Sequence, residues 1–260
     1  MATSNIEGPI PFDPHDYLVR YFSDINDEYR SLYRFWARAV ASLPRGLRAL
    51  ELGVGPTLYS AFPLAERFGE IVLADFVPGS LAELERWLRA DDGAFDWTPY
   101  VELALQAEGK VGTRVEVLER MALLRSVVRD VVRCDLRTVQ PLGREATFDL
   151  VSAHYCTEAA STSEDEWSRV LANVTSLVKP GGWLLLSVAA ELSIYRTYDP
   201  AVVAKRSPNV TRRLVETTLT ALGFVADSWT LEMIEAPEDR PYSRTCVVFA
   251  QLPSRTTRST

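Results

Sequence analysis

The 260-residue chain is short of the features on which nucleic-acid and membrane binding depend. Its 28 Lys and Arg are outnumbered by 35 Asp and Glu, and a net charge of −7 leaves no broad basic surface to neutralise phosphates. The uncharged stretch Pro180–Ala190 is far shorter than the roughly 20 residues of a membrane helix. The first 13 residues lack the basic start and apolar run of a signal peptide. We therefore expect a cytoplasmic protein with neither nucleic acid nor membrane as a partner.

Cysteine and histidine are also scarce. Cys134, Cys156 and Cys246 form no CxxC pair, and His15 and His154 stand far apart in the chain. Neither a disulfide framework nor the usual ligand spacings of a zinc site can be built from so few residues. The sequence predicts no metal.

What the chain does contain is a regular alternation of short apolar runs and longer charged segments. The apolar runs, expected as strands, are Leu47–Gly53, Ile71–Asp75, Val131–Leu136, Phe148–Ala153, Trp183–Ala190, Trp229–Ala236 and Cys246–Leu252. The segments with helical periodicity are Leu58–Phe68, Ser80–Arg89, Val115–Arg129, Glu164–Val178 and Val210–Leu222. This alternation is typical of an α/β fold with a doubly wound, Rossmann-like sheet.

Two amphipathic segments, Asp16–Phe22 and Glu28–Ser42, precede this pattern and predict an N-terminal helical cap over residues 12–42. No internal repeat or linker divides the rest. We expect one domain over residues 1–252, with its core at 47–252 and a flexible tail at 253–260.

A glycine loop follows the first predicted strand. Gly53 and Gly55 permit a tight turn and a close approach by a ligand, and Asp75 stands 20 residues after Gly55, where such folds place an acid on ribose hydroxyls. The third glycine of a dinucleotide site is replaced by Leu58, and Pro56 opens the next predicted helix without a backbone donor. A nucleoside ligand without phosphates, such as S-adenosylmethionine, fits this pattern.

A further acid, Asp135, ends the third predicted strand. At the carboxyl edge of the sheet its carboxylate would accept a hydrogen bond from the adenine amino group. An Asp in this position also commonly caps the following turn. The sequence is compatible with both roles of Asp135, the adenine contact and the turn cap.

Several longer motifs point to one family. They are Phe12–Leu18 (FDPHDYL), Gly53–Tyr59 (GVGPTLY), Gly93–Pro99 (GAFDWTP) and Lys179–Gly182 (KPGG). With them the chain, from Phe12 to about Leu252, resembles the small-molecule N-methyltransferases that include the nicotinamide, phenylethanolamine, indolethylamine and thioether enzymes. The resemblance implies a seven-stranded methyltransferase sheet with a helical lid and S-adenosyl-L-methionine as cofactor, with S-adenosyl-L-homocysteine as product.

The resemblance implies cofactor contacts at Tyr17, Gly53, Tyr59, Asp75 and Asp135. Neighbouring residues complete the predicted cofactor site: Tyr21, Gly55, Thr57, Ser80, Leu136 and His154. Phe22 and Ser80 stand where a relative has Tyr and Asn, so contacts at these two positions are expected to be weaker or apolar.

The acceptor is expected just after the fourth strand. Glu158 matches an acidic position near the substrate amine of phenylethanolamine-type relatives, where a carboxylate would pair with the amine and take its proton; alternatively it is a solvated residue at a helix start. His154, with an ordinary imidazole pKa, would be a second candidate base, although a lone His is more often structural. The predicted acceptor-binding residues are Tyr17, Tyr155, Glu158, Glu191, Tyr195 and Asp239.

The leading hypothesis is methyl transfer to an amine or ring nitrogen of a small aromatic or heteroaromatic molecule by a monomeric enzyme. Val188 stands where nicotinamide-type enzymes have Asp, which argues against nicotinamide itself. Three alternatives remain: methylation of an indole ring carbon, with His154 or Glu158 taking the N–H proton; a noncatalytic nucleoside-binding protein; and, less favoured for want of the third glycine, a nicotinamide-dependent dehydrogenase.

Overall fold

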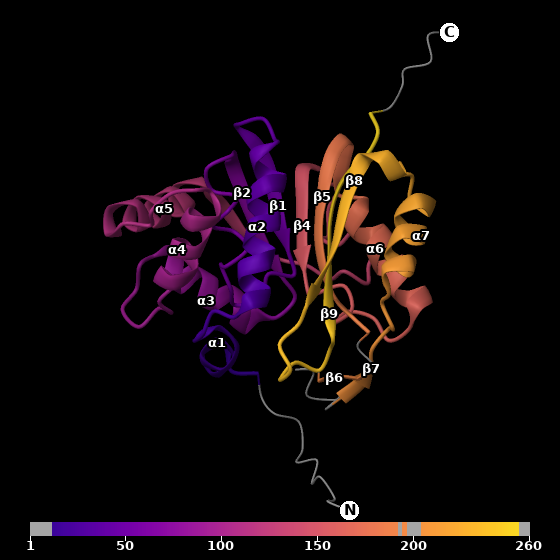
Figure 1. Ribbon diagram of the computed structural model, residues 1–260, viewed down its shortest axis with the longest axis horizontal. Helices are drawn as coiled ribbons and strands as arrows, with labels where there is room; N and C mark the ends of the chain where they lie inside the picture. Colours follow the sequence, from indigo (N-terminus) through magenta and orange to yellow (C-terminus); the bar gives the residue numbers. More distant parts are fainter. Residues whose placement is uncertain (1–11, 192–193, 197–203, 255–260) are drawn as a thin grey trace, which may run out of the picture.

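The computed structural model describes residues 12–191, 194–196 and 204–254, and within them seven strands form one mixed sheet (Figure 1). The strands are β1 (Leu47–Leu52), β2 (Phe68–Asp75), β3 (Val128–Arg133), β4 (Phe148–His154), β5 (Val178–Ala190), β8 (Trp229–Glu235) and β9 (Arg244–Gln251). Their order is β3-β2-β1-β4-β5-β9-β8, with β1 to β5 parallel and β9 antiparallel to both of its neighbours. The predicted α/β Rossmann-like sheet is confirmed.

Helices cover both faces of this sheet. They are α1 (Pro14–Phe22), α2 (Asp27–Ala41), α3 (Pro78–Leu88), α4 (Thr98–Ala107), α5 (Arg114–Val127), α6 (Glu164–Thr175) and α7 (Arg212–Ala221). Side chains of α1 to α5 join one buried apolar cluster, and those of α6 and α7 join the cluster on the opposite face. No helix among the described residues has the length and apolar character needed to cross a membrane.

The two N-terminal helices begin at side-chain caps. Asp13 Oδ1 accepts the backbone N–H of His15 at 2.8 Å, and Asn26 Oδ1 accepts that of Tyr29 at 3.0 Å. Such caps satisfy amide groups that have no partner within the helix. Leu18 of α1 and Trp36 of α2 are almost fully buried in the same cluster as the sheet. Both predicted N-terminal helices are present, and both share the core.

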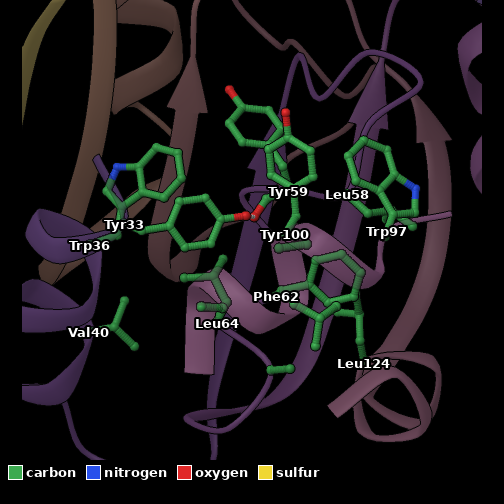
Figure 2. Packing of buried hydrophobic residues seen from close by; sticks show 14 of the residues in the cluster. Tyr33, Trp36, Val40, Leu58, Tyr59, Phe62, Leu64, Trp97, Tyr100 and Leu124 are labelled. Atoms are coloured by element: carbon green, nitrogen blue, oxygen red, sulfur yellow. Dashed lines mark hydrogen bonds between the residues drawn. The ribbon is translucent and has the colours of Figure 1, made fainter. Parts of the chain in front are cut away.

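The predicted helix Leu58–Phe68 is wrong: turns run through this segment. Its bonds are mostly of the i to i+3 type, such as Leu64 N–H to the Ala61 carbonyl at 3.1 Å. Pro63 has no N–H to offer the carbonyl of Tyr59, and a helix interior does not tolerate that loss. The Tyr59 carbonyl instead accepts a hydrogen bond from the Tyr33 hydroxyl at 2.6 Å (Figure 2).

Other differences from the sequence pattern are smaller. Helix α4, which starts in the Gly93–Pro99 motif, was not predicted, and neither were the short paired strands β6 (Ile194–Arg196) and β7 (Ala204–Arg206). Strand β3 lies three residues earlier than expected at both ends. At the carboxyl ends of the parallel strands, α1 and the β8–β9 loop come to the same end of the molecule (Figure 1).

Candidate functional site

The glycine loop follows β1, as predicted. Gly53 and Gly55 have φ angles of +67° and +64°, a region that favours glycine. A Cβ on Gly53 would lie 2.4 Å from that of Cys156, so no larger residue fits there. A Cβ on Gly55 would meet nothing nearer than Thr57 Cγ2 at 4.0 Å. The loop is thus packed tightly at Gly53 and open at Gly55, where a ligand can approach the backbone.

Asp75 ends β2 beside this loop and is 7% exposed. Its Oδ2 accepts the N–H of Gly55 at 2.8 Å, and its Oδ1 accepts that of Val77 at 2.9 Å. Ser80 donates a third hydrogen bond to the carboxylate. Burial raises the pKa of Asp75 above its ordinary value, and these hydrogen bonds partly oppose that shift. The predicted residues Gly53, Gly55, Asp75 and Ser80 therefore lie together.

Glu51, on β1, is a residue that the sequence reasoning missed. It is 1% exposed, and its Oε1 accepts the Ser152 hydroxyl at 3.2 Å. Its Oε2 is buried and has no hydrogen-bond partner among the described residues. Burial raises the pKa of Glu51 to about 7, against the hydrogen bonds from Ser60 and Ser152. An acid on a buried strand directly before the glycine loop was the available signal.

His154 lies at the end of β4 with its ring 4.5 Å from that of Trp36. Its Nε2 is 2.8 Å from Ser152 Oγ, and its Nδ1 is 2.9 Å from Ser187 Oγ. Burial lowers the pKa of His154 to about 3, so the ring is neutral even though Glu51 Oε1 lies 3.6 Å away. The expected imidazole with an ordinary pKa is therefore wrong, because a buried ring cannot be hydrated when it gains a charge.

Aromatic rings from α1 gather beside the loop. Tyr17 is partly exposed, and its ring lies 5.0 Å from Tyr21 and 5.9 Å from Phe22. Phe22 lies 5.1 Å from Tyr59, which follows the glycine loop. The structure thus brings the predicted Tyr17, Tyr21 and Tyr59 into one aromatic group, with Phe22 between helix and loop.

Three other predicted cofactor residues have partners within the chain. The Thr57 hydroxyl donates to the Val54 carbonyl at 2.7 Å, and Leu136 is buried among apolar side chains. Asp135 lies two residues beyond β3, where its carboxylate accepts from the Arg137 backbone at 3.1 Å and guanidinium at 2.9 Å. The turn-capping interpretation of Asp135 is therefore present in the structure.

Glu158 is fully buried, so the alternative of a solvated residue is wrong. Its Oε1 accepts the backbone N–H of Ala189 at 2.7 Å, and its Oε2 accepts the Thr157 hydroxyl at 3.1 Å. Strand β4 ends at His154, paired with Ser187, and is too short to reach Ala189. Glu158 supplies the acceptor that β4 lacks and ties the ends of β4 and β5 together.

A second buried carboxylate, Glu28, lies at the start of α2 and was also missed. It is 2% exposed. Its Oε1 accepts the hydroxyls of Tyr155 at 2.9 Å, Tyr242 at 3.1 Å and Thr245 at 2.5 Å. Tyr155 follows β4, Tyr242 lies in the β8–β9 loop, and Thr245 lies on β9. Three segments distant in sequence thus meet on this carboxylate.

The remaining predicted acceptor residues lie near the same edge. Glu191 follows β5 with φ +62° and accepts the Ser243 hydroxyl at 2.5 Å, and Asp239 is exposed in the β8–β9 loop. Tyr195 belongs to β6, but its side chain lies outside the described residues.

Comparison with known proteins identifies the family. The sequence profile of the NNMT/PNMT/TEMT family matches residues 3–242. Nicotinamide N-methyltransferase of Homo sapiens is 33% identical over 193 residues, which cover 71% of this chain and 72% of that protein. Indolethylamine N-methyltransferase of Oryctolagus cuniculus is 34% identical over 193 residues, which again cover 71% of this chain and 72% of that protein. Phenylethanolamine N-methyltransferase of Macaca mulatta is 36% identical over 154 residues, or 58% and 54% of the two chains.

Solved structures show the same fold. The N-methyltransferase NodS from Bradyrhizobium japonicum WM9, in complex with S-adenosyl-L-homocysteine, has a TM-score of 0.51 at 14% identity, covering 94% of this chain and all of that one. The CurJ carbon methyltransferase has a TM-score of 0.52 at 17% identity, covering 87% and 54%. The family resemblance noted in the sequence is confirmed. The chain belongs to the NNMT/PNMT/TEMT family and is an enzyme that transfers a methyl group from S-adenosylmethionine.

Proposed function

We propose that this enzyme methylates a nitrogen atom of a small aromatic or heteroaromatic amine. The observation that carries the proposal is the set of partly buried aromatic side chains that pack against one apolar cluster at the carboxyl edge of the sheet: Tyr17 and Tyr21 from α1, and Tyr155 after β4, whose ring lies 6.0 Å from that of Tyr242. Relatives named for nicotinamide, indolethylamine and phenylethanolamine support it, since each name denotes a small molecule with an aromatic ring and a nitrogen. Aromatic walls suit such an acceptor because stacked rings favour each other beyond area burial alone.

The residues around the glycine loop fit the cofactor. Asp75 would hold the ribose hydroxyls, and the open surface at Gly55 would admit the nucleoside. The partnerless Glu51 Oε2 suits the α-ammonium group, because a buried carboxylate oxygen without a donor is costly until a cation or donor reaches it. The cofactor supplies a methyl group already activated on a sulfonium.

The protein's own contribution would then be to orient the acceptor and exclude water. Positioning of two reactants can supply roughly 7–11 kcal/mol of a barrier. Helix α1 would close over the carboxyl edge of the sheet. The buried hydroxyls and carboxylates at the end of β4 and the start of β9 would receive the acceptor nitrogen. Val188, fully buried and apolar, offers no carboxylate to a nicotinamide amide.

The test is to incubate the enzyme with methyl-¹³C-labelled S-adenosylmethionine and a panel of arylalkylamines, pyridines and indoles, and to locate the label by NMR. Each active acceptor is matched by its analogue with oxygen in place of the reacting nitrogen. We expect the label on nitrogen and none on the matched analogue. Label on a ring carbon, or no transfer while S-adenosylhomocysteine still binds, would contradict the proposal.

A further inference from the structure

Resting on the proposed nitrogen methylation, we propose that Tyr155 and Glu28 form a proton relay, in which the Tyr155 hydroxyl faces the acceptor nitrogen and Glu28 receives the proton through it. The relay would deprotonate an acceptor that arrives as an ammonium ion. It assigns this step to two residues distant in sequence, in place of the predicted His154 and Glu158.

The surroundings of Glu28 suit the final proton acceptor of such a relay. Its carboxylate is 2% exposed, yet hydroxyls of Tyr155, Tyr242 and Thr245 all reach it, so its charge is stabilised by donors and not by water. No cation lies within ion-pair distance of Glu28 among the described side chains, and Arg240 acts on it only from farther away. A carboxylate that is buried but not neutralised attracts an ammonium ion at the neighbouring surface.

Tyr155 is connected to the glycine loop through its neighbour in the chain. It is partly exposed, and its hydroxyl donates to Glu28 Oε1 at 2.9 Å and lies 3.0 Å from Thr245 Oγ1. The next residue, Cys156, packs directly against Gly53, and its Sγ–H reaches the Leu52 carbonyl at 3.3 Å. Tyr155 therefore stands next to the predicted cofactor loop.

The backbone of Tyr155 supports a functional placement. Its φ is +55°, in the left-handed region, which bulky residues with a Cβ seldom occupy. Strain of this kind persists only where surrounding contacts enforce it, and it gathers at functional sites. Here the contacts are those of the phenol with Glu28 and Thr245.

His154 and Glu158, the two bases predicted from the sequence, are less suited to take a proton from the acceptor. Both ring nitrogens of His154 have hydroxyl partners, and burial holds its pKa at about 3. Glu158 is fully buried, with one carboxylate oxygen on the Ala189 amide and the other on the Thr157 hydroxyl. Burial raises the pKa of Tyr155 well above its usual value, so its phenol keeps the proton that it donates to Glu28.

The acceptor ammonium gives one proton to the Tyr155 oxygen as the phenol gives its own proton to Glu28, so no phenolate accumulates and the nitrogen keeps the N–H electron pair. That lone pair forms the bond to the methyl carbon, and the electron pair of the carbon–sulfur bond returns to sulfur. The product leaves as a methylated ammonium ion, and the proton on Glu28 returns through the Tyr155 hydroxyl to water at the acceptor position.

The test compares Tyr155→Phe with Tyr242→Phe, because each removes one hydroxyl from Glu28 but only Tyr155 adjoins Cys156, the residue that packs on the glycine loop. Glu28→Gln, Glu28→Asp and the double variant Tyr155→Phe/Glu28→Gln complete the set. For each protein, kcat and KM are measured with an arylalkylamine that the unmodified enzyme methylates. Affinity for S-adenosylhomocysteine is measured by calorimetry, and Tm by thermal unfolding.

We expect Tyr155→Phe and Glu28→Gln each to lower kcat by about 10- to 100-fold with cofactor affinity kept within twofold. The double variant should be no slower than the slower single variant, since both interrupt one path. Glu28→Asp should recover part of the rate. A pyridine acceptor, uncharged at pH 7.5 and without N–H, should show none of these losses.

Equal kcat for Tyr155→Phe and the unmodified enzyme would overturn the relay, as would equal losses in Tyr155→Phe and Tyr242→Phe. A loss of the same size with a pyridine would overturn it too. If the Glu28 variants do not fold, the two phenylalanine variants decide alone. If the unmodified enzyme methylates no nitrogen, both the proposed function and the relay are overturned. If it methylates nitrogen but Tyr155→Phe has no effect, only the relay is overturned.

Discussion

The two carboxylate oxygens of Asp75 accept the backbone N–H groups of Gly55 and Val77 and so fix the glycine loop. The Ser80 hydroxyl and the Phe76 N–H also reach this carboxylate, so a ribose hydroxyl would share it with these donors or replace one of them. We expect Asp75→Ala to weaken S-adenosylhomocysteine binding by roughly 1.5–3 kcal/mol, the usual value of a hydrogen bond to a charged group.

Calorimetry measures that affinity. Thermal unfolding shows whether the variant is still folded and how much stability it has lost. Asp75→Asn is the matched variant, since it keeps the side chain's size and one acceptor oxygen and should lose less. Unchanged affinity in a folded Asp75→Ala protein would remove Asp75 from the cofactor site.

The raised pKa of Glu51 predicts that cofactor binding is coupled to the release of a proton. Its pKa of about 7 means that most molecules carry a proton on this carboxyl at pH 6.5. If the α-ammonium group of S-adenosylhomocysteine pairs with Glu51, binding should release a fraction of a proton at that pH, because a nearby cation favours the ionised form. Calorimetry in two buffers of different ionisation enthalpy measures the release. Glu51→Gln should abolish it, and an identical release in the variant would refute the pairing.

At the scale of elements, α1 should behave as a lid. It is nine residues long, and Tyr17 is partly exposed, whereas Leu18 on the same helix is fully buried. We expect Tyr17→Ala to lower kcat with little change in Tm, because lids come from the less stable regions of a structure. Leu18→Ala, the control, should instead cost about 2–5 kcal/mol of stability. A large fall in Tm with full turnover in Tyr17→Ala would mean that Tyr17 is an ordinary core residue.

The elements that the sequence could predict are those with a strong local pattern. Buried runs such as Phe148–Ala153 and capped amphipathic helices such as α2 carry their own signal. The segment Leu58–Phe68 has helical periodicity, but one proline at position 63 decides against a helix, and the hydroxyl that compensates comes from Tyr33 on α2. Periodicity does not record such a distant partner.

At the scale of the whole molecule, the buried His154 makes stability depend on pH. Between pH 6.5 and about 3 the unfolded chain binds a proton that the folded ring does not, so the free energy of unfolding falls as the pH is lowered through this window. Each pH unit costs up to about 1.4 kcal/mol. We expect the destabilisation caused by His154→Gln to be about 2 kcal/mol smaller at pH 5 than at pH 7.5.

Urea unfolding of both proteins at the two pH values measures this difference. Glu51, whose pKa is raised, acts in the opposite direction between its ordinary value and about 7, but it is present in both proteins and largely cancels. A destabilisation that is the same at pH 5 and pH 7.5 would show that His154 titrates normally.

The juxtaposition of the glycine loop and Asp75 was predictable, because they lie at the ends of consecutive strands and their spacing is local. The cluster around Glu28 was not predictable. Glu28 and Thr245 are 217 positions apart, and nothing in either neighbourhood indicates the other. The boundaries of the single domain, the monomeric state, the cytoplasmic location and the individual site roles stay predictions.

The position of β9 between β5 and β8 has a consequence for biosynthesis. Glu28 leaves the ribosome 217 residues before Thr245, whose hydroxyl it accepts. A nascent chain can thus complete the strands and loop around Asp75 while its acceptor end is still open, with the Glu28 carboxylate in water. Chains that stop before residue 244 should accordingly lack turnover, because without β9 neither the sheet nor the contacts around Glu28 can be completed.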